Sequence, residues 1–343
     1  MFGIDIGVDL GTANVLVHVK GKGIVLDEPS VVAIDSLSKK VVAVGEEARR
    51  MLGRTPGHIV ATRPLREGVI ADFDTTEIML RHFINKSIGK SPFKRPRVMI
   101  CVPSGITSVE QKAVIEAAER TGAKQVYLIS EPKAAAIGAG LDIFEPSGSM
   151  VVDIGGGTTD VAVLSLGDVV TANSIRVAGD KFDEAIIRHI RKEHSLLIGE
   201  RTAEEIKIRV ASVFPHARHE KLDIRGRDMI SGLPKTVTVE SEEMREALQE
   251  TVDLIVAATK SVLEQTPPEL AADIFDKGIV LTGGGALLHG LDRLLQQELL
   301  VPVHIAHDPL FCVVKGTGIA LDNLNKVSRS LLNKKTTSNV VQV

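Results

Sequence analysis

The segment Val151–Asp160, which reads VVDIGGGTTD, constrains the fold of this chain more than any other stretch. Apolar residues of strand type lead to Asp153, and three consecutive glycines and Thr158 follow. Because glycine has no Cβ, the backbone N–H groups of such a turn can approach an anion closely, and a threonine hydroxyl adds another donor. The segment therefore predicts a phosphate-binding turn, although a glycine triplet by itself also occurs in plain hairpins and tight turns.

A second copy of this pattern lies near the start of the chain, in Val8–Asn14 (VDLGTAN). An apolar run again delivers an aspartate, Asp9, to a turn that contains Gly11 and Thr12, and a strand-like run follows at Val15–Val19. Two such hairpins predict a duplicated domain, with both turns facing one polyphosphate across a cleft. The paired carboxylates suit a hydrated Mg²⁺, which keeps most of its waters and takes few protein ligands directly.

A third glycine-rich turn, Leu281–Leu287 (LTGGGAL), follows the strand-like run Gly278–Leu281 and is predicted to close over a nucleoside. The chain contains neither the GxxxxGK[ST] pattern of a Walker loop nor the Rossmann pattern GxGxxG followed by an acidic residue. The three turns therefore predict a nucleotide fold of a different class.

Composition limits the remaining possibilities. With 343 residues, 44% of them hydrophobic, the chain can bury a large core in about two domains. A formal net charge of -3 gives no reason to expect nucleic acid as a partner. Cys101 and Cys312 have no metal-ligand spacing and fit a reduced, cytoplasmic setting. The N-terminus lacks a signal-peptide pattern, and no apolar run reaches the roughly 18–20 residues that span a bilayer, so we expect a soluble or peripheral protein.

Strand-like and helical patterns alternate along the chain, which predicts an α/β protein. Among them, the strand Val126–Ile129 runs into Glu131 and Pro132, and a helix of small residues, Ala134–Gly140, follows. Proline in a first turn places Glu131 at a helix N-terminus, where the helix dipole stabilises a carboxylate whether or not it has a chemical role. Local sequence therefore leaves a capping role for Glu131 open. Glu204 and Lys207, three residues apart on a predicted helix, are equally compatible with a surface ion pair.

Several motifs together resemble the bacterial actin family, and within it the MreB branch. They are VDLGTAN, EPKAAAIGAG after a strand, DIGGGTTD, IGERTAEEIK and LTGGGALLHGL, in the right order from about residue 4 to 325. The segments VHVKGKGIVL and IRGRDMISGLPKT, and an Asp rather than Glu at the end of DIGGGTTD, are most similar to the Mbl group of that branch.

This resemblance implies the actin/Hsp70-type ATPase fold, an α/β fold of two RNase-H-like core domains, each with a small α+β insert, around a central nucleotide cleft. The implied division is core domain IA at 1–31, 65–141 and 311–330, insert IB at 32–64, core domain IIA at 142–178 and 241–310, insert IIB at 179–240, and a flexible tail at 331–343.

The resemblance also implies the site. Asp9 and Asp153 would hold Mg²⁺ through water, and Glu131 would orient the attacking water, with Thr159 and Asp160 beside it. The implied contacts to ATP are Thr12, Ala13, Asn14, Gly155, Gly156, Gly157, Thr158, Glu204, Glu205, Ile206, Lys207, Gly284, Gly285, Ala286 and Leu287.

The implied function is that of a weak Mg²⁺-dependent ATPase that polymerises into filaments at the inner face of the cell membrane, organises cell-wall synthesis and maintains rod shape. Its implied partners are further copies of itself, MreB paralogues, and membrane-bound shape proteins of the RodZ, MreC and MreD type. The basic segment Lys86–Arg97 (KSIGKSPFKRPR) is predicted to touch an anionic membrane surface, although a charge run is more often a solvated loop.

Three other classes share parts of this pattern. A chaperone ATPase of the Hsp70 type would need a β-rich substrate domain and more chain. A sugar or acetate kinase would need larger inserts with a catalytic base of their own. The division-linked actin relative would need a C-terminal amphipathic anchor, and Val327–Val343 lacks the apolar stripe of one. We therefore expect the filament-forming protein.

Overall fold

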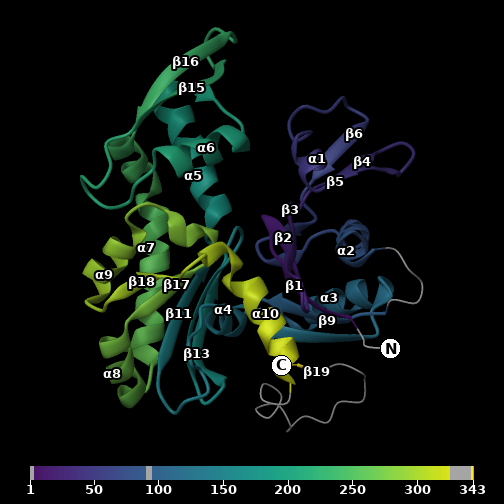
Figure 1. Cartoon of the computed structure of the whole chain (residues 1–343). Helices are drawn as coiled ribbons and strands as arrows, with labels where there is room; N and C mark the ends of the chain where they lie inside the picture. Colours follow the sequence, from purple (N-terminus) through teal and green to yellow (C-terminus); the bar gives the residue numbers. More distant parts are fainter. Residues whose placement is uncertain (1–3, 90–94, 325–340, 343) are drawn as a thin grey trace.

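The computed structural model describes residues 4–89, 95–324 and 341–342. The chain forms two lobes that lie side by side (Figure 1). Lobe I contains residues 4–141 and 311–324 together with the short strand β19 (Val341–Gln342), and lobe II contains residues 142–310.

The central sheets of the two lobes have the same topology. Lobe I has the strand order β19-β10-β9-β1-β2-β3, and lobe II has the order β13-β12-β11-β17-β18. In each lobe the first three strands along the chain are antiparallel neighbours, and the next two are added in parallel. In lobe I the short strand β19 adds one more parallel strand at the edge. The predicted duplication is therefore confirmed. The strands are β1 (Asp5–Leu10), β2 (Asn14–Val19), β3 (Gly23–Pro29), β9 (Arg97–Val102), β10 (Gln125–Ser130), β11 (Ser149–Ile154), β12 (Thr159–Ser165), β13 (Asp168–Ile175), β17 (Ile279–Thr282) and β18 (Val303–Ile305).

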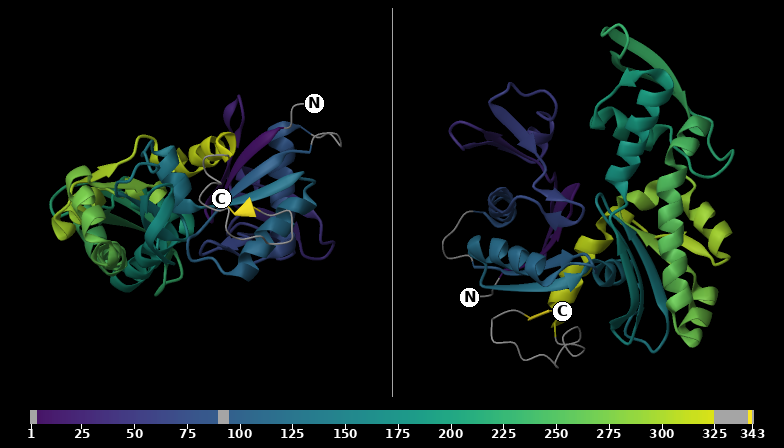
Figure 2. Two further views of the ribbon diagram at one scale, coloured as in Figure 1. Left: turned by 90° about the horizontal axis from the view of Figure 1, so that it is seen from below. Right: turned by 180° about the vertical axis from the view of Figure 1, so that it is seen from behind.

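A small sheet extends from the same end of each lobe, as the view from behind shows (Figure 2). Both small sheets lie within the predicted inserts, 32–64 and 179–240. The first contains β4 (Val32–Asp35), β5 (Val41–Val44) and β6 (Ile59–Thr62), with helix α1 (Glu46–Arg49). The second contains β14 (Leu196–Leu197), β15 (Lys221–Asp228) and β16 (Pro234–Glu240), with helices α5 (Gly179–His194) and α6 (Glu200–Arg209).

The other helices cover the central sheets. They are α2 (Phe73–Ile88), α3 (Ser108–Arg120), α7 (Ser241–Gln265), α8 (Pro268–Lys277) and α9 (Leu291–Leu299). Sequence patterns missed α8, because Pro267 and Pro268 mark the end of α7. In the structure Pro268 is the first residue of the next helix, a position where its missing N–H is not needed.

The lobes share a hydrophobic core. This interlobe cluster joins Met99, Tyr127 and Ile129 of lobe I to Val151 and Leu164 of lobe II. Between them lie helix α4 (Glu131–Gly138), which follows β10, and helix α10 (Cys312–Asp322), which follows β18 and the short 3-10 turn η2 (Pro309–Phe311). Since both helices lie where the chain passes between lobes, their packing sets how the lobes meet.

Glycines bring α4 and α10 into backbone contact. A Cβ added at Gly138 would lie 1.8 Å from the carbonyl oxygen of Cys312, and one added at Gly316 would lie 1.8 Å from that of Ala134. Each glycine therefore lies on the carbonyl of a residue four positions before the partner glycine. Neither helix could carry a side chain at this crossing without moving away from the other.

Two predicted segments differ from the structure. The tail 331–343 was expected to be flexible throughout, but Val341 and Gln342 pair in parallel with Tyr127 and Leu128 at the edge of the lobe I sheet. The basic segment was expected to be a loop from Lys86 onward, but α2 continues to Ile88. Residues 90–94 of that segment lie outside the described residues.

We predict that Gly316→Ala lowers the stability of the protein, even though alanine favours a helix over glycine by about 1 kcal/mol. Overpacking against the Ala134 carbonyl costs about 1–3 kcal/mol and exceeds that gain. Thermal unfolding measures the effect. Gly57→Ala is the control, because an added Cβ at Gly57 meets nothing within 4 Å. A Gly316→Ala protein as stable as the wild type would show that the crossing can relax.

Candidate functional site

The two predicted phosphate turns lie against each other between the lobes. The β1–β2 turn and the β11–β12 turn are so close that a Cβ at Gly156 would lie 2.7 Å from Ala13 Cβ. A Cβ at Gly157 would lie 2.5 Å from the hydroxyl oxygen of Thr12. Gly156 and Gly157 thus have no room for a side chain beside the first turn, whether or not a ligand is bound. The structure brings the two predicted turns together, as the duplication requires.

Hydrogen bonds with neighbouring segments hold both turns in place. Ser30 Oγ donates to the Gly11 carbonyl over 2.6 Å, and Thr12 Oγ1 accepts the N–H of Gly68 over 3.0 Å. Gly68 lies at the tip of a short hairpin formed by strands β7 (Leu65–Arg66) and β8 (Val69–Ile70). In the second turn, the carbonyls of Gly155 and Gly156 accept N–H groups from the first turn of α5. Contacts within the protein therefore hold the two turns in their conformations without a bound ligand.

Asn14, a predicted ATP contact, and Thr159, predicted to lie beside Glu131, have side-chain partners of their own. Asn14 Nδ2 donates to Asp27 over 2.8 Å, and Thr159 Oγ1 donates to the Val177 carbonyl over 2.6 Å. Thr159 is fully buried, so its side chain supports the β12–β13 end of the sheet and does not face the cleft. One of the two Asn14 amide N–H donors is therefore already used within lobe I.

Each aspartate predicted to hold Mg²⁺ accepts one hydrogen bond from the parallel strand beside it. Asp9 Oδ1 accepts from the Cys101 thiol over 3.2 Å, and Asp153 Oδ1 accepts from the Thr282 hydroxyl over 2.7 Å. Burial is the main reason why the pKa of Asp9 rises to about 6 and that of Asp153 to about 7. Burial also raises the pKa of the Cys101 thiol well above its usual range, so the thiol keeps its proton and remains a donor.

Glu131 and Asp160 complete a group of four carboxyls. Asp160 is fully buried, and its Oδ1 accepts the N–H of Ser104 over 2.7 Å. Within the described part of the chain, its Oδ2 has no hydrogen-bond partner. Burial raises the pKa of Asp160, and the pKa of Glu131 is raised well above its usual range by burial and then by Asp160, Asp153 and Asp9. Glu131 is the first residue of α4, and it lies among charges of its own sign. A helix-capping role alone does not require that environment.

The donor set fits a hydrated divalent cation. Within residues 4–89 and 95–324, no three His, Cys, Asp or Glu side chains converge as direct metal ligands would. Mg²⁺ suits such a site, because it keeps several waters and binds through one or two carboxylates and substrate phosphates. Asp9 and Asp153 are the residues that would hold those waters, and the positive charge would favour the ionised form that burial disfavours in both.

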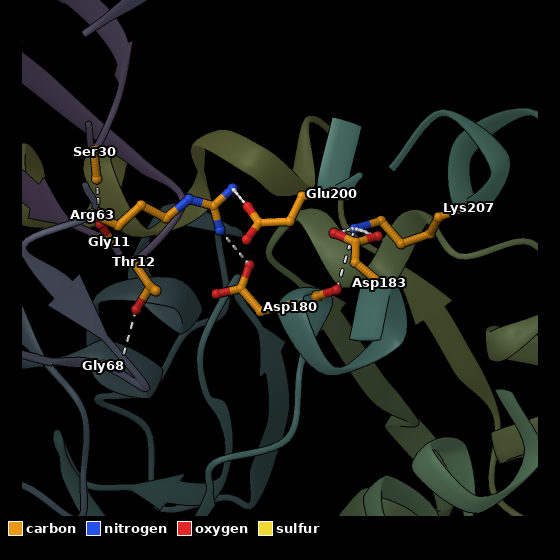
Figure 3. A network of polar contacts seen from close by, with 10 residues as sticks. Gly11, Thr12, Ser30, Arg63, Gly68, Asp180, Asp183, Glu200 and Lys207 are labelled. Atoms are coloured by element: carbon orange, nitrogen blue, oxygen red, sulfur yellow. Dashed lines mark hydrogen bonds and ion pairs between the residues drawn. The ribbon is translucent and has the colours of Figure 1, made fainter. Parts of the chain in front are cut away.

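Helix α6 presents only part of the predicted IGERTAEEIK contact set to the cleft. Lys207 Nζ reaches Asp183 Oδ2 over 3.0 Å and the Gly179 carbonyl over 3.3 Å (Figure 3). The surface-pair alternative required Lys207 to pair with Glu204. Lys207 instead pairs with residues of α5. Glu205 pairs with Arg209 on the exposed face, and Ile206 is fully buried in the lobe II core. The side chains of Glu205 and Ile206 thus lie away from the cleft.

The third glycine turn forms the 3-10 turn η1 (Gly284–Leu287). A Cβ at Gly285 would lie 2.2 Å from Ile154 Cγ2, and Ala286 is fully buried, so these two residues pack inward. Leu287 is 54% exposed, and the added Cβ of Gly284 would touch only Leu310. Gly284 and Leu287 are therefore the two residues of this turn that are free to line a base pocket.

Charged pairs cross the cleft outside the turns. Arg63 of lobe I contacts Asp180 over 3.0 Å and Glu200 over 3.6 Å in lobe II (Figure 3). Glu67, beside Gly68, lies 3.4 Å from Arg176. Arg63, Glu67, Asp180 and Glu200 line a cavity of about 560 Å³. These cross-lobe charges were not identified from the sequence. The one local pattern that could have indicated them is the pair of acidic residues Asp180 and Asp183 near the start of α5.

Comparisons with known proteins agree with this geometry. Residues 3–329 match the family described as MreB/Mbl protein. The chain belongs to the MreB/Mbl family. It is 66% identical to the cell shape-determining protein Mbl of Bacillus subtilis, over 97% of this chain and 100% of that protein. The crystal structure of MreB5 of Spiroplasma citri bound to AMPPNP has a TM-score of 0.91 and 40% identity, and covers 97% of this chain and 100% of that one.

The MreB/Mbl assignment confirms the actin-like fold predicted from the sequence. The chain of the MamK double helical filament shares this fold, with a TM-score of 0.79 at 23% identity over 94% of this chain and 99% of that one. In the part of the MreB/Mbl chain that the structure describes, no helix combines the length and apolar character needed to cross a membrane.

We predict that Glu131→Gln slows ATP hydrolysis without lowering the unfolding temperature of the protein. Glutamine removes a carboxyl from a crowded, buried group, so the nucleotide-free protein should unfold at the same or a higher temperature than the wild type. If Glu131 orients the attacking water, ATP hydrolysis should fall by about 10²-fold. Glu145→Gln, which changes an exposed carboxyl, is the control. Wild-type hydrolysis by Glu131→Gln would leave only the helix-capping role.

Proposed function

We propose that this chain is an ATP-binding and ATP-hydrolysing cytoskeletal protein that forms membrane-associated filaments, organises cell-wall synthesis and maintains rod shape. The observation that carries the proposal is the meeting of two glycine turns and four carboxyls between two duplicated lobes. Its 66%-identical relative is named a cell shape-determining protein, and a 40%-identical relative was crystallised with AMPPNP, an ATP analogue. Both names point to the same use of this cleft.

The chain's own residues supply the binding part of this proposal. Backbone N–H groups of the two turns, at Thr12–Asn14 and Gly156–Thr158, hold the β- and γ-phosphates, while the Gly155 N–H closes the second turn by donating to the Thr158 carbonyl. Lys207 and Glu204 on one side, and Gly284 and Leu287 on the other, enclose the ribose and the base. Mg²⁺, held through water by Asp9 and Asp153, would neutralise phosphate charge.

Hydrolysis follows from positioning and not from covalent chemistry. Glu131 orients the attacking water toward the γ-phosphate, because phosphoryl transfer asks the protein mainly for alignment and charge stabilisation. Asp160, held by the Ser104 N–H, keeps a negative charge or a shared proton beside Glu131. The result is a slow ATPase whose nucleotide state regulates assembly with further copies of the chain, with MreB paralogues, and with membrane proteins of the RodZ, MreC and MreD type.

Assembly with different nucleotides tests the function. We expect the protein to form filaments with Mg²⁺-ATP, seen by negative-stain microscopy and pelleting, and to release phosphate slowly. Parallel samples with ADP and without nucleotide measure how strongly assembly depends on the bound state. A protein that binds ATP but remains monomeric, or passes phosphate to a small acceptor, would contradict the filament proposal and favour a kinase.

Membrane attachment is proposed for the segment Lys86–Arg97. Two of its basic residues already have partners: Lys86 pairs with Glu28, and Arg97 donates to both carboxylate oxygens of Asp5. Arg95 is exposed, and Lys90, Phe93 and Lys94 lie outside the described residues. Each basic residue near an anionic surface contributes about 1 kcal/mol, so single subunits should bind weakly and filaments should bind by avidity.

We predict that Phe93→Ser combined with Lys94→Glu abolishes co-sedimentation with anionic liposomes, while filaments still form in solution. The charge reversal Lys22→Glu, at an exposed position in the β2–β3 turn, is the control and should leave pelleting unchanged. Raising the salt concentration should weaken wild-type binding. Undiminished liposome pelleting of the double variant would place the membrane contact elsewhere.

A further inference from the structure

The internal duplication assigns equivalent positions to Cys101 and Thr282. β1 and β9 pair in parallel with Val8 opposite Ile100, so the next residues in register are Asp9 and Cys101. In the other lobe, β11 and β17 pair in parallel with Asp153 opposite Thr282. Thr282 is the last residue of β17 and Cys101 is the last but one of β9, so each donor lies near the end of the parallel strand beside its aspartate. Each gives its hydrogen to an Oδ1 atom.

Both donors are enclosed by protein. Cys101 is 2% exposed and Thr282 is fully buried, so water cannot take over their hydrogen bonds. In both lobes one carboxylate oxygen is held against the sheet, and the other carries no side-chain donor among the hydrogen bonds of the described residues. The structure repeats this arrangement with different chemistry, a thiol in lobe I and a hydroxyl in lobe II.

We propose that Cys101 and Thr282 are a matched pair of positioning residues, each of which fixes one oxygen of Asp9 or Asp153 so that the second oxygen faces the hydrated cation of the nucleotide. This inference rests on the proposed function. A carboxylate without its donor can rotate, and the water shell it should hold loses a fixed acceptor. Partners of this kind commonly change metal affinity by about 10–100-fold when they are removed.

The test measures binding and not hydrolysis. A fluorescent ATP analogue is loaded on the protein, and its retention is followed while free Mg²⁺ is lowered with EDTA. We expect Cys101→Ala and Thr282→Val each to raise the Mg²⁺ concentration for half retention by about 10–100-fold. Retention in excess EDTA should change little. Cys101→Ser and Thr282→Ser keep a hydroxyl donor and should behave like the wild type.

Two comparisons keep the result unambiguous. Thr259→Val removes another fully buried hydroxyl, which donates to the Ile255 carbonyl within α7, and should not alter the Mg²⁺ requirement. Thr282→Val preserves side-chain shape and so covers the case in which Cys101→Ala fails to fold. The inference is overturned if Cys101→Ala and Thr282→Val stay within twofold of the wild type, or if the serine variants lose as much as they do. A wild-type protein whose nucleotide retention ignores Mg²⁺ would instead contradict the proposed function.

Discussion

The backbone contact between α4 and α10 determines the geometry of the whole molecule. The chain passes between the lobes at these two helices, and Gly138 and Gly316 let each helix rest on a carbonyl of the other. Because Glu131 is the first residue of α4, any change in the crossing moves the Glu131 carboxyl relative to Asp153 and Asp160 of lobe II. The packing of Gly138 and Gly316 therefore influences the distances between the carboxyls of the two lobes in the cleft.

That crossing also brings together groups that repel one another. Asp9 and Glu131 come from lobe I, and Asp153 and Asp160 come from lobe II. Burial raises the pKa values of all four, and the charges of the neighbouring group members raise those of Glu131 and Asp153 further. Cross-lobe ion pairs such as that of Arg63 with Asp180 act in the opposite direction, but they are partly exposed and each contributes little. The shared hydrophobic core must supply most of the interlobe attraction, and a bound cation would lower the remaining repulsion.

Sequence patterns predicted the parts of the site that depend on local structure. An aspartate at a strand end followed by glycine is visible within ten residues, so the two glycine turns and their duplication could be predicted correctly, and their binding of phosphate stays a prediction. Cys101 and Thr282 were missed as donors because their role depends on strand register across the sheet, which joins residues 92 and 129 positions apart. Lys207 was predicted at the cleft, but its partner Asp183 lies on another helix, where helical spacing gives no indication. The side chains of Glu205 and Ile206 point away from the cleft, because consecutive residues of a motif face different directions on a helix.

The glycines of the turns satisfy two demands that sequence alone cannot separate. A phosphate needs backbone N–H groups without Cβ atoms in front of them, and the opposite turn needs space behind them. Gly156 and Gly157 meet the second demand directly, since any side chain there would collide with Ala13 or Thr12. Gly285 meets it in another way, because it packs on Ile154 under the second turn. The ligand site and the lobe interface are therefore built from the same residues, so a substitution that enlarges one of these glycines must alter how the lobes close as well as what the cleft binds.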